Sequence, residues 1–447
     1  MRPEKGRVGL SEDVMEKMLT VALAGLGNRG LYAYGNELHR LQDSVKVTAV
    51  ADIDPEKVNS AKELFSLDEA HCFSSAEALL AQPQLADVLF ITTQDRQHVD
   101  HAIPALHAGY DVVLEKPISP DAAEIQVLLE AKRQTGKQVI VCHVLRYTPF
   151  YNTIKDVLDA GTVGTVMNIQ AIENVGYYHH AHSFVRGNWR RSDTTSPMIL
   201  QKCCHDFDIF LWLTGGIPQR VSSFGALSFF TAANAPEGAA DYCMGGCKAK
   251  DACVFDAEKI YLTNPRTGFL QGNSGWPNDV VAFQPTEQKL RDNLNCGPYG
   301  RCVYRCDNTV VDHQVVNVEL SGNILINFTM SAFSPDVTRV TKIMGTSGCI
   351  LADTGTNTIT VAPFGKKAYQ AEIAVQPAHS GHGGGDGGLV REAVDYFLHP
   401  ERKSVRLSSL EVSVGSHLIA LAAEASRLEN GKVIPINVNT RALSSVL

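Results

Sequence analysis

Three glycines near the start of the chain are spaced to hold a dinucleotide. Gly25, Gly27 and Gly30 form the pattern G-x-G-x-x-G directly after the apolar run at residues 21–24. In such a turn the first glycine permits a tight bend, the second lets a pyrophosphate approach the backbone, and the third lets helix and strand pack closely. A helix that starts near Gly30 would direct its free N–H groups at the phosphates. The pattern therefore predicts a dinucleotide site.

An acid follows at the position that such a site requires. The β-rich run at residues 45–51 ends at Asp52, 22 residues beyond Gly30, close to the spacing of about 20 for the acid that binds the ribose hydroxyls. A carboxylate there would repel a 2′-phosphate and so favours NAD over NADP. Arg29 is compatible with either cofactor, because it could contact the pyrophosphate of NAD or the 2′-phosphate of NADP. The alternative is that Asp52 and Asp54 only cap the next helix.

Alternating strand and helix patterns place this turn in a parallel sheet. Further strand-like runs span residues 87–93, 110–117 and 138–142, and helical patterns lie between them at 69–81, 98–108 and 122–135. This order predicts an α/β Rossmann domain, a doubly wound parallel sheet, over residues 19–147. Ligands of such sheets bind at the carboxyl ends of the strands. Residues at those ends are Thr92, Thr93, Glu115, Lys116, His143 and Arg146.

The pattern changes at about residue 148. After a helix at residues 151–160, alternation with a period of two recurs at 165–173, 220–230, 312–320, 324–332, 339–344 and 358–361, and helices are expected at 389–397 and 410–429. We therefore expect an α+β domain with a large, mainly antiparallel sheet over residues 148–447. Residues 1–18 are expected to form a flexible tail, and a cysteine-rich insertion to occupy about residues 233–311.

Length and composition limit the class of protein. A chain of 447 residues is too long for one ordinary core. The net charge of −8 argues against broad nucleic-acid binding, which needs a basic surface. No apolar run reaches the length of a membrane span, and the N-terminus lacks the apolar core of a signal peptide. We expect a cytoplasmic protein without nucleic-acid or membrane partners, whose cysteines are thiols or metal ligands.

The cysteines are unusually concentrated. Six of the eleven form two groups, Cys243, Cys247 and Cys253, then Cys296, Cys302 and Cys306. The segment between is rich in Gly, Pro and Asn, and a metal would supply folding free energy to a segment with little apolar material to bury. We favour a structural zinc held by Cys243, Cys247, Cys253 and Cys302, with Cys306 competing for the fourth place. An iron–sulfur cluster, which uses the same ligand count, and free thiols are the alternatives.

Two further stretches carry histidines. Residues 176–190 hold three histidines, two arginines and four aromatics, which suit a polyol pocket, notably through His182 and Arg186. A structural loop at a subunit contact is the equal alternative. The glycine-rich run at residues 379–388 allows close backbone approach to a ligand, and His382 or Asp386 could close over a pocket. The alternative there is a hinge or a helix cap.

The motif Glu115-Lys116-Pro117 stands at a strand end after the glycine turn. With this motif the chain resembles the Gfo/Idh/MocA oxidoreductases over nearly its whole length. The resemblance implies that Lys116 lies beside nicotinamide and substrate, where an ammonium stabilises alkoxide character. It also implies a second-domain sheet that is often buried between subunits, hence a homodimer or homotetramer. The implied cofactor contacts are Gly25, Gly27, Asn28, Arg29, Gly30, Asp52, Thr93, His98, Glu115 and Lys116.

A helix at residues 196–213 matches the family pattern D-x-x-x-H-x-x-D in its last two positions, His205 and Asp208. The first aspartate is replaced by Gln201, which cannot act as a base, and Lys202 follows as a second cation. His205 is the candidate base because its ordinary pKa lies near neutrality, and Asp208 is a candidate substrate contact. The alternative is a helix with one satisfied histidine and a solvated lysine.

These observations predict an NAD-dependent oxidoreductase that acts on a sugar or cyclic polyol, with Lys116, Lys202 and His205 around the reacting hydroxyl. One alternative is a redox-neutral enzyme that oxidises a sugar transiently, eliminates a glycosidic substituent and reduces the ring again. A second alternative is a non-catalytic NAD-binding sugar sensor.

Overall fold

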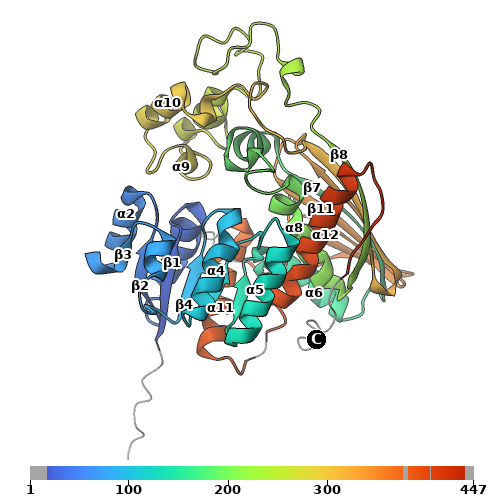
Figure 1. Cartoon of the computed structure of the whole chain (residues 1–447). Coiled ribbons are helices and arrows are strands. Elements are labelled where there is room, and N and C mark those ends of the chain that lie inside the picture. The colour runs from blue at the N-terminus through green and yellow to red at the C-terminus, as the bar shows by residue number, and fades with distance from the viewer. Residues whose placement is uncertain (1–17, 376–380, 403, 438–447) are drawn as a thin grey trace, which may run out of the picture.

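Two β-sheets organise the molecule, and the computed structural model describes residues 18–375, 381–402 and 404–437 (Figure 1). The first sheet is parallel, with six strands in the order β3-β2-β1-β4-β5-β6. Its strands are β1 (Leu19–Ala24), β2 (Val45–Ala51), β3 (Cys72–Phe73), β4 (Val88–Ile91), β5 (Asp111–Leu114) and β6 (Val139–Val141). The predicted doubly wound sheet is confirmed, although the sequence did not predict the short strand β3.

Helices cover both faces of this sheet, which explains why its strands are continuously apolar. They are α1 (Asn36–Arg40), α2 (Pro55–Phe65), α3 (Ala76–Leu80), α4 (His98–His107) and α5 (Ala122–Thr135). Local signals fix their ends: the Asp121 side chain accepts a hydrogen bond from the backbone N–H of Ala123 at the start of α5, and Gly136 ends it with φ +68°. These short connections bring the carboxyl ends of the strands to one edge.

The second sheet has nine strands in the order β14-β13-β12-β11-β7-β10-β9-β8-β15. Its strands are β7 (Val166–Asn174), β8 (Pro218–Ala226), β9 (His313–Leu320), β10 (Ile324–Ser331), β11 (Thr338–Gly345), β12 (Gly348–Asp353), β13 (Thr358–Pro363), β14 (Tyr369–Gln370) and β15 (Ile434–Pro435). Among the described strands of this second sheet, only the β7–β10 pair is parallel. The predicted mainly antiparallel sheet is therefore confirmed.

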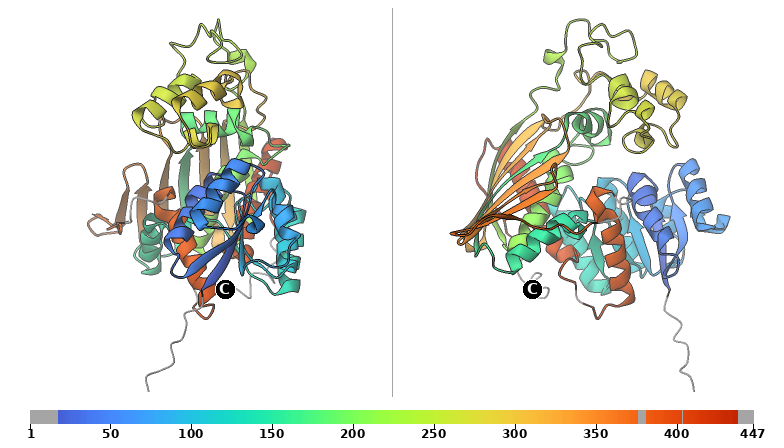
Figure 2. Two further views of the ribbon diagram at one scale, coloured as in Figure 1. Left: turned by 90° about the vertical axis from the view of Figure 1, so that its left-hand side faces the viewer. Right: turned by 180° about the vertical axis from the view of Figure 1, so that it is seen from behind.

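Helices pack on one face of the nine-stranded sheet and leave the other face open (Figure 2). The helices on and beside it are α6 (Pro149–Asp159), α7 (Tyr177–His180), α8 (Met198–Thr214) and α12 (Leu410–Leu428). Phe207 and Phe210 of α8 pack against Phe328 of β10. This packing holds α8 between the two sheets.

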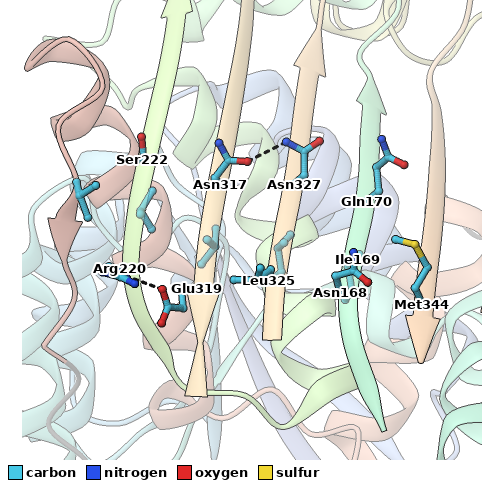
Figure 3. Close-up of a pocket in the computed structure, with 14 residues that line it drawn as sticks. Asn168, Ile169, Gln170, Arg220, Ser222, Asn317, Glu319, Leu325, Asn327 and Met344 are labelled. Carbon is cyan, nitrogen blue, oxygen red and sulfur yellow. Dashed lines mark hydrogen bonds and ion pairs between the residues drawn. The ribbon is translucent and has the colours of Figure 1, made fainter. Parts of the chain in front are cut away.

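The side chains labelled in the groove on the open face are mostly polar, with Leu325 and Met344 among them (Figure 3). A groove of about 660 Å³ crosses β7, β10, β9 and β8 there. In the groove, the side-chain amide of Asn327 donates to Asn317 at 2.9 Å, and Arg220 forms an ion pair with Glu319. The groove contains none of the predicted site residues, which lie at the other side of the sheet.

The helix α11 (Gly385–Leu398) returns to the parallel sheet. Its residues Leu389 and Val390 share a core with Val21 and Leu23 of β1, and all four are fully buried. The last part of the chain therefore completes the core that the first part begins.

The cysteine-rich insertion joins β8 to β9 and contains α9 (Asn278–Val281) and α10 (Glu287–Cys296). It lies above the parallel sheet in Figure 1. The expectation that this segment has little apolar material to bury is wrong, because it has its own core. That core includes Phe230, Phe255, Ile260, Tyr261, Leu290 and Leu294. Within the described residues, no helix combines the length and apolar character needed to cross a membrane.

Candidate functional site

The glycine turn follows β1 with the geometry that the motif requires. Gly25 has φ +91°, and a Cβ at this position would lie 2.7 Å from the backbone of Thr92. A Cβ at Gly30 would lie 1.9 Å from the carbonyl oxygen of Gly25, whereas a Cβ at Gly27 would meet nothing within 4 Å. The helical segment Asn28–Gly35 then begins at Asn28, slightly earlier than expected. Gly25 and Gly30 are thus required by packing, and Gly27 leaves open space beside the turn.

We therefore expect opposite effects from two alanine substitutions. Gly30→Ala should destabilise the fold by about 1–3 kcal/mol through overpacking. Gly27→Ala should leave stability unchanged but lower NAD affinity by about tenfold or more, because a methyl group would occupy the space of a pyrophosphate. Urea unfolding and calorimetric titration with NAD measure the two quantities. Undiminished NAD affinity in Gly27→Ala would contradict this use of the open space.

The carboxylate of Asp52 lies beside this turn. It accepts a hydrogen bond from the backbone N–H of Leu26 at 2.5 Å and another from Asp54 at 2.8 Å. Asp54, in contrast, caps α2 by accepting from the backbone N–H of Glu56 at 3.0 Å. The two acids therefore have different roles, and Asp52 is the one at the strand end that faces the glycine turn.

Arg29 is held by two carboxylates. Its Nε donates to Glu115 at 2.7 Å, and its Nη atoms donate to Asp386 at 2.8 and 3.0 Å. Burial alone would raise the pKa of Asp386, but Arg29 and His382 hold that pKa well below its ordinary value. Through Asp386, the glycine-rich run contacts Arg29 of the glycine turn. The guanidinium of Arg29 is therefore already hydrogen-bonded to carboxylates of the protein. His379 lies outside the described residues.

The loops after β4 and β5 are tied together by His98. One ring nitrogen lies 2.6 Å from the carbonyl oxygen of Pro117 and the other 3.1 Å from that of Thr93. His98 is 1% exposed, so it connects these two loops from inside the protein. The peptide bond between Lys116 and Pro117 is cis. The Nζ of Lys116 donates to the backbone carbonyl of Gln201 at 3.0 Å, which brings the lysine onto α8.

His205 lies on α8 near two other histidines. Its ring centroid is 5.8 Å from that of His143 and 6.2 Å from that of His382. Its Nδ1 is buried and has no hydrogen-bond partner. Burial, followed by the charge of Lys116, lowers the pKa of His205 well below its ordinary value. The imidazole is therefore neutral at neutral pH and has a free ring nitrogen.

Asp208 forms a buried ion pair with Arg146. Arg146 donates to its two carboxylate oxygens at 2.7 and 2.6 Å, and both side chains are almost fully buried. Burial raises the pKa of Asp208, and Arg146 opposes that shift. The structure thus places Asp208 as a partner of Arg146, whereas the sequence had suggested a substrate contact.

Lys202 belongs to a buried charge network that the sequence analysis missed. Its Nζ lies 3.4 Å from Glu173 of β7, whose carboxylate is 2.9 Å from Arg339 of β11. Arg339 also pairs with Asp206 at 2.8 Å. Burial lowers the pKa of Lys202, while Glu173 raises it. The alternation along β7 puts Glu173 on the same face as the apolar residues Ile169 and Ala171. This pattern in the sequence could have predicted that Glu173 is buried.

His182 and Arg186 pack into the insertion. His182 is stacked on Tyr299 at 4.7 Å and lies 2.9 Å from the hydroxyl of Tyr261. Burial lowers the pKa of His182 to about 3. Arg186 is fully buried, and its Nε and Nη2 donate to the carbonyls of Arg301 and Phe255 at 2.7 Å. Arg186 therefore lies among the cysteines and not with Lys116 and His205.

The four cysteines predicted to bind zinc line one small cavity in the insertion. However, nowhere in residues 18–375, 381–402 and 404–437 does a group of three or more His, Cys, Asp or Glu side chains have an arrangement that holds a metal ion. The expected tetrahedral zinc site is therefore not supported. Cys306 does not line this cavity.

Comparison with known proteins gives matches over both sheets. Residues 19–143 match the family model described as "Oxidoreductase family, NAD-binding Rossmann fold", and residues 151–258 match "GFO/IDH/MocA C-terminal domain". The YteT protein of Bacillus subtilis is 24% identical over 428 residues, which cover 90% of this chain and 94% of that protein.

Two further proteins are similar over different lengths. An inositol 2-dehydrogenase of Gluconacetobacter diazotrophicus is 27% identical over 197 residues, covering 43% of this chain and 55% of that protein. A solved inositol dehydrogenase homolog from Azotobacter vinelandii, complexed with NAD⁺, has a TM-score of 0.66 at 14% identity and covers 96% of this chain and 100% of its own. The structural likeness establishes the fold.

Proposed function

Since the chain belongs to the Gfo/Idh/MocA family of NAD-binding oxidoreductases, we propose that it transfers a hydride between NAD and a hydroxyl-bearing carbon of a sugar or cyclic polyol. The observation that carries this proposal is the convergence of Lys116 and α8. The lysine lies at the carboxyl end of β5 and reaches the backbone of Gln201, one turn before His205. An ammonium and a neutral imidazole are thereby brought to the strand edge that bears the glycine turn.

The residues of this chain have complementary roles in the proposed reaction. NAD, when bound, supplies the hydride acceptor. His205 accepts the hydroxyl proton, because burial and the charge of Lys116 lower its pKa and keep the imidazole neutral. The ammonium of Lys116 stabilises the alkoxide that develops as the proton leaves. Lys202 adds positive charge from the adjacent turn of α8.

The cofactor preference follows from charge. Asp52 places a carboxylate beside the glycine turn, and Arg29 is already paired with Glu115 and Asp386. The 2′-phosphate of NADP would be repelled by the carboxylate of Asp52, and Arg29 is not free to compensate that repulsion. We therefore propose that NAD is preferred over NADP. The sugar or polyol class is supported by the inositol dehydrogenases among the similar proteins.

The proposal is tested by incubating the purified chain with NAD and a panel of hexoses, hexosides and inositols. Absorbance of NADH reports net oxidation, and chromatography of the sugars reports cleavage of a glycosidic bond. Accumulation of NADH with at least one member supports the proposal. Glycoside cleavage without NADH would instead support the redox-neutral alternative. Calorimetric NAD binding without either change would favour a sensor.

We also propose that the open face of the nine-stranded sheet forms the interface of a homo-oligomer. Outward apolar side chains on this face are Met167, Ile172, Phe224, Val315, Leu325 and Leu351. A row of large apolar side chains across several strands is typical of a surface that another chain covers.

Leu325→Arg, at the groove of Figure 3, should therefore shift the protein to smaller species, because the guanidinium would be buried without a partner. Light scattering coupled to size exclusion measures the mass. Val127→Arg is the matched control, since Val127 is equally exposed but lies on α5. A monomeric wild type, or equal masses for both variants, would refute this interface.

A further inference from the structure

One short segment of the cysteine-rich insertion, residues 278–283, contacts the domain of the parallel sheet. The side-chain amide of Asn28 donates to the carboxylate of Asp279 at 2.8 Å, across 251 positions of the sequence. The ring of Phe283 lies 6.4 Å from the ring of Tyr32 and packs on the core that includes β1. Figures 1 and 2 show the insertion extending over this domain. The two contacts therefore connect the insertion to the start of the parallel sheet.

Both contacts fall on the helical segment that leaves the glycine turn. That segment is Asn28–Gly35, and Asn28 directly follows Gly27. A Cβ at Gly27 would meet nothing within 4 Å, so the turn has open space at this point. In a G-x-G-x-x-G turn, this is where a pyrophosphate approaches the backbone. Residues 278–283 therefore lie beside the space that a dinucleotide would fill.

One carboxylate oxygen of this segment lacks a hydrogen-bond donor. Oδ2 of Asp279 accepts from Asn28, but Oδ1 is buried and has no hydrogen-bond partner in the part of the chain that the structure describes. Burial raises the pKa of Asp279, and the hydrogen bond from Asn28 opposes that shift. A buried carboxylate oxygen without a donor costs free energy. A ligand that donates a hydrogen bond to Oδ1 would remove this cost.

The chemistry of a dinucleotide limits which of its groups can be this donor. The pyrophosphate carries negative charge and only acceptor oxygens, so a carboxylate repels it. The riboses on either side of the pyrophosphate carry hydroxyls, which donate well to carboxylates. Asp52 is the expected partner of the adenosine ribose. This leaves the hydroxyls of the nicotinamide ribose for Asp279.

We propose that residues 278–283 form a second wall of the dinucleotide site, in which the carboxylate of Asp279 accepts a hydrogen bond from the nicotinamide ribose of bound NAD. Phe283 anchors this wall by packing on the core next to β1. The insertion thereby slows the release of the cofactor. The inference rests on the NAD binding of the proposed function and does not require that a sugar is oxidised.

The test is the rate at which the full-length protein releases NADH, measured by stopped-flow fluorescence during displacement with excess NAD. Asp279→Ala should release NADH about 10–100-fold faster, the loss expected for a hydrogen bond to a charged group. Its affinity for ADP, which lacks the nicotinamide ribose, should be unchanged. Asp279→Asn keeps the shape and an acceptor oxygen, so its rate should be intermediate. Asp292→Ala is the matched control, since Asp292 is exposed on α10 and accepts from Gln288.

Phe283→Ala tests the anchor and should also release NADH faster. Phe269→Ala is its control, because Phe269 is likewise half-buried but packs on the insertion's own core. Wild-type release rates in the Asp279 and Phe283 variants, or an equal loss of ADP affinity, would overturn the inference. Unchanged rates in a protein that oxidises a sugar would refute this wall alone. Faster release in a protein that oxidises no sugar would refute only the proposed reaction.

Discussion

Replacing Lys116 with alanine is expected to lower kcat/KM by about 10²–10⁴-fold and to leave NAD affinity nearly unchanged. Lys116 reaches α8 from the strand edge, because its Nζ donates to the carbonyl of Gln201. Without it, negative charge on the substrate oxygen would develop with only Lys202 nearby, and Lys202 is drawn toward Glu173. The glycine turn, which binds the cofactor, is not altered by this change.

Steady-state rates on the substrate found in the panel, together with calorimetric NAD titration, measure the two effects. Lys46→Ala is the matched control, since Lys46 is exposed on β2. A variant that keeps wild-type turnover would exclude Lys116 from the chemistry. Loss of NAD binding in Lys116→Ala would instead assign it to the cofactor site alone.

The second large effect is expected on stability. Arg146→Leu should lower the free energy of unfolding by about 3–5 kcal/mol, because it leaves Asp208 buried and unpaired. The pair is bidentate and its side chains are 4% and 1% exposed. The nearest other cationic group is His143, 3.7 Å from Asp208, but burial lowers the pKa of His143 and disfavours its charge. The double variant with Asp208→Leu should recover much of the loss, since no uncompensated charge remains.

Urea denaturation of the two single variants and the double variant gives the coupling between the residues. Arg133→Leu is the control, because Arg133 forms a comparable ion pair with Glu130 on the exposed face of α5, and exposed pairs contribute little. If Arg146→Leu is as stable as the control, the buried pair does not have the assigned role.

The sequence signals for the predicted cofactor side of the site are local. Glycine spacing, the acid after β2 and the position of Lys116 at a strand end each depend on a few adjacent residues. The structure keeps all of them at one edge of the sheet. Arg29 was harder, because its partner Asp386 is 357 residues away. No local pattern indicates that an arginine in a phosphate-binding turn is held by a carboxylate from the other end of the chain.

The interior of the second half was predicted less completely. Its strands were visible as alternation, but the charges of Glu173, Arg339 and Asp206 belong to three separate elements that meet only in the fold. Arg186 was grouped with His182 as a polyol contact because both lie in one polar stretch. The structure directs Arg186 to the cysteines, since the insertion folds onto that stretch.

The packing of α11 against the parallel sheet has a consequence for the chain while the ribosome makes it. Leu389, which completes the core around β1, follows Ala24 by 365 residues. At about 5–20 residues per second, a ribosome needs roughly 20–70 s to make that length. For that time the apolar surface that α11 covers stays open on the nascent chain. Early release, or a stop before residue 385, should therefore yield chains that require chaperones or aggregate.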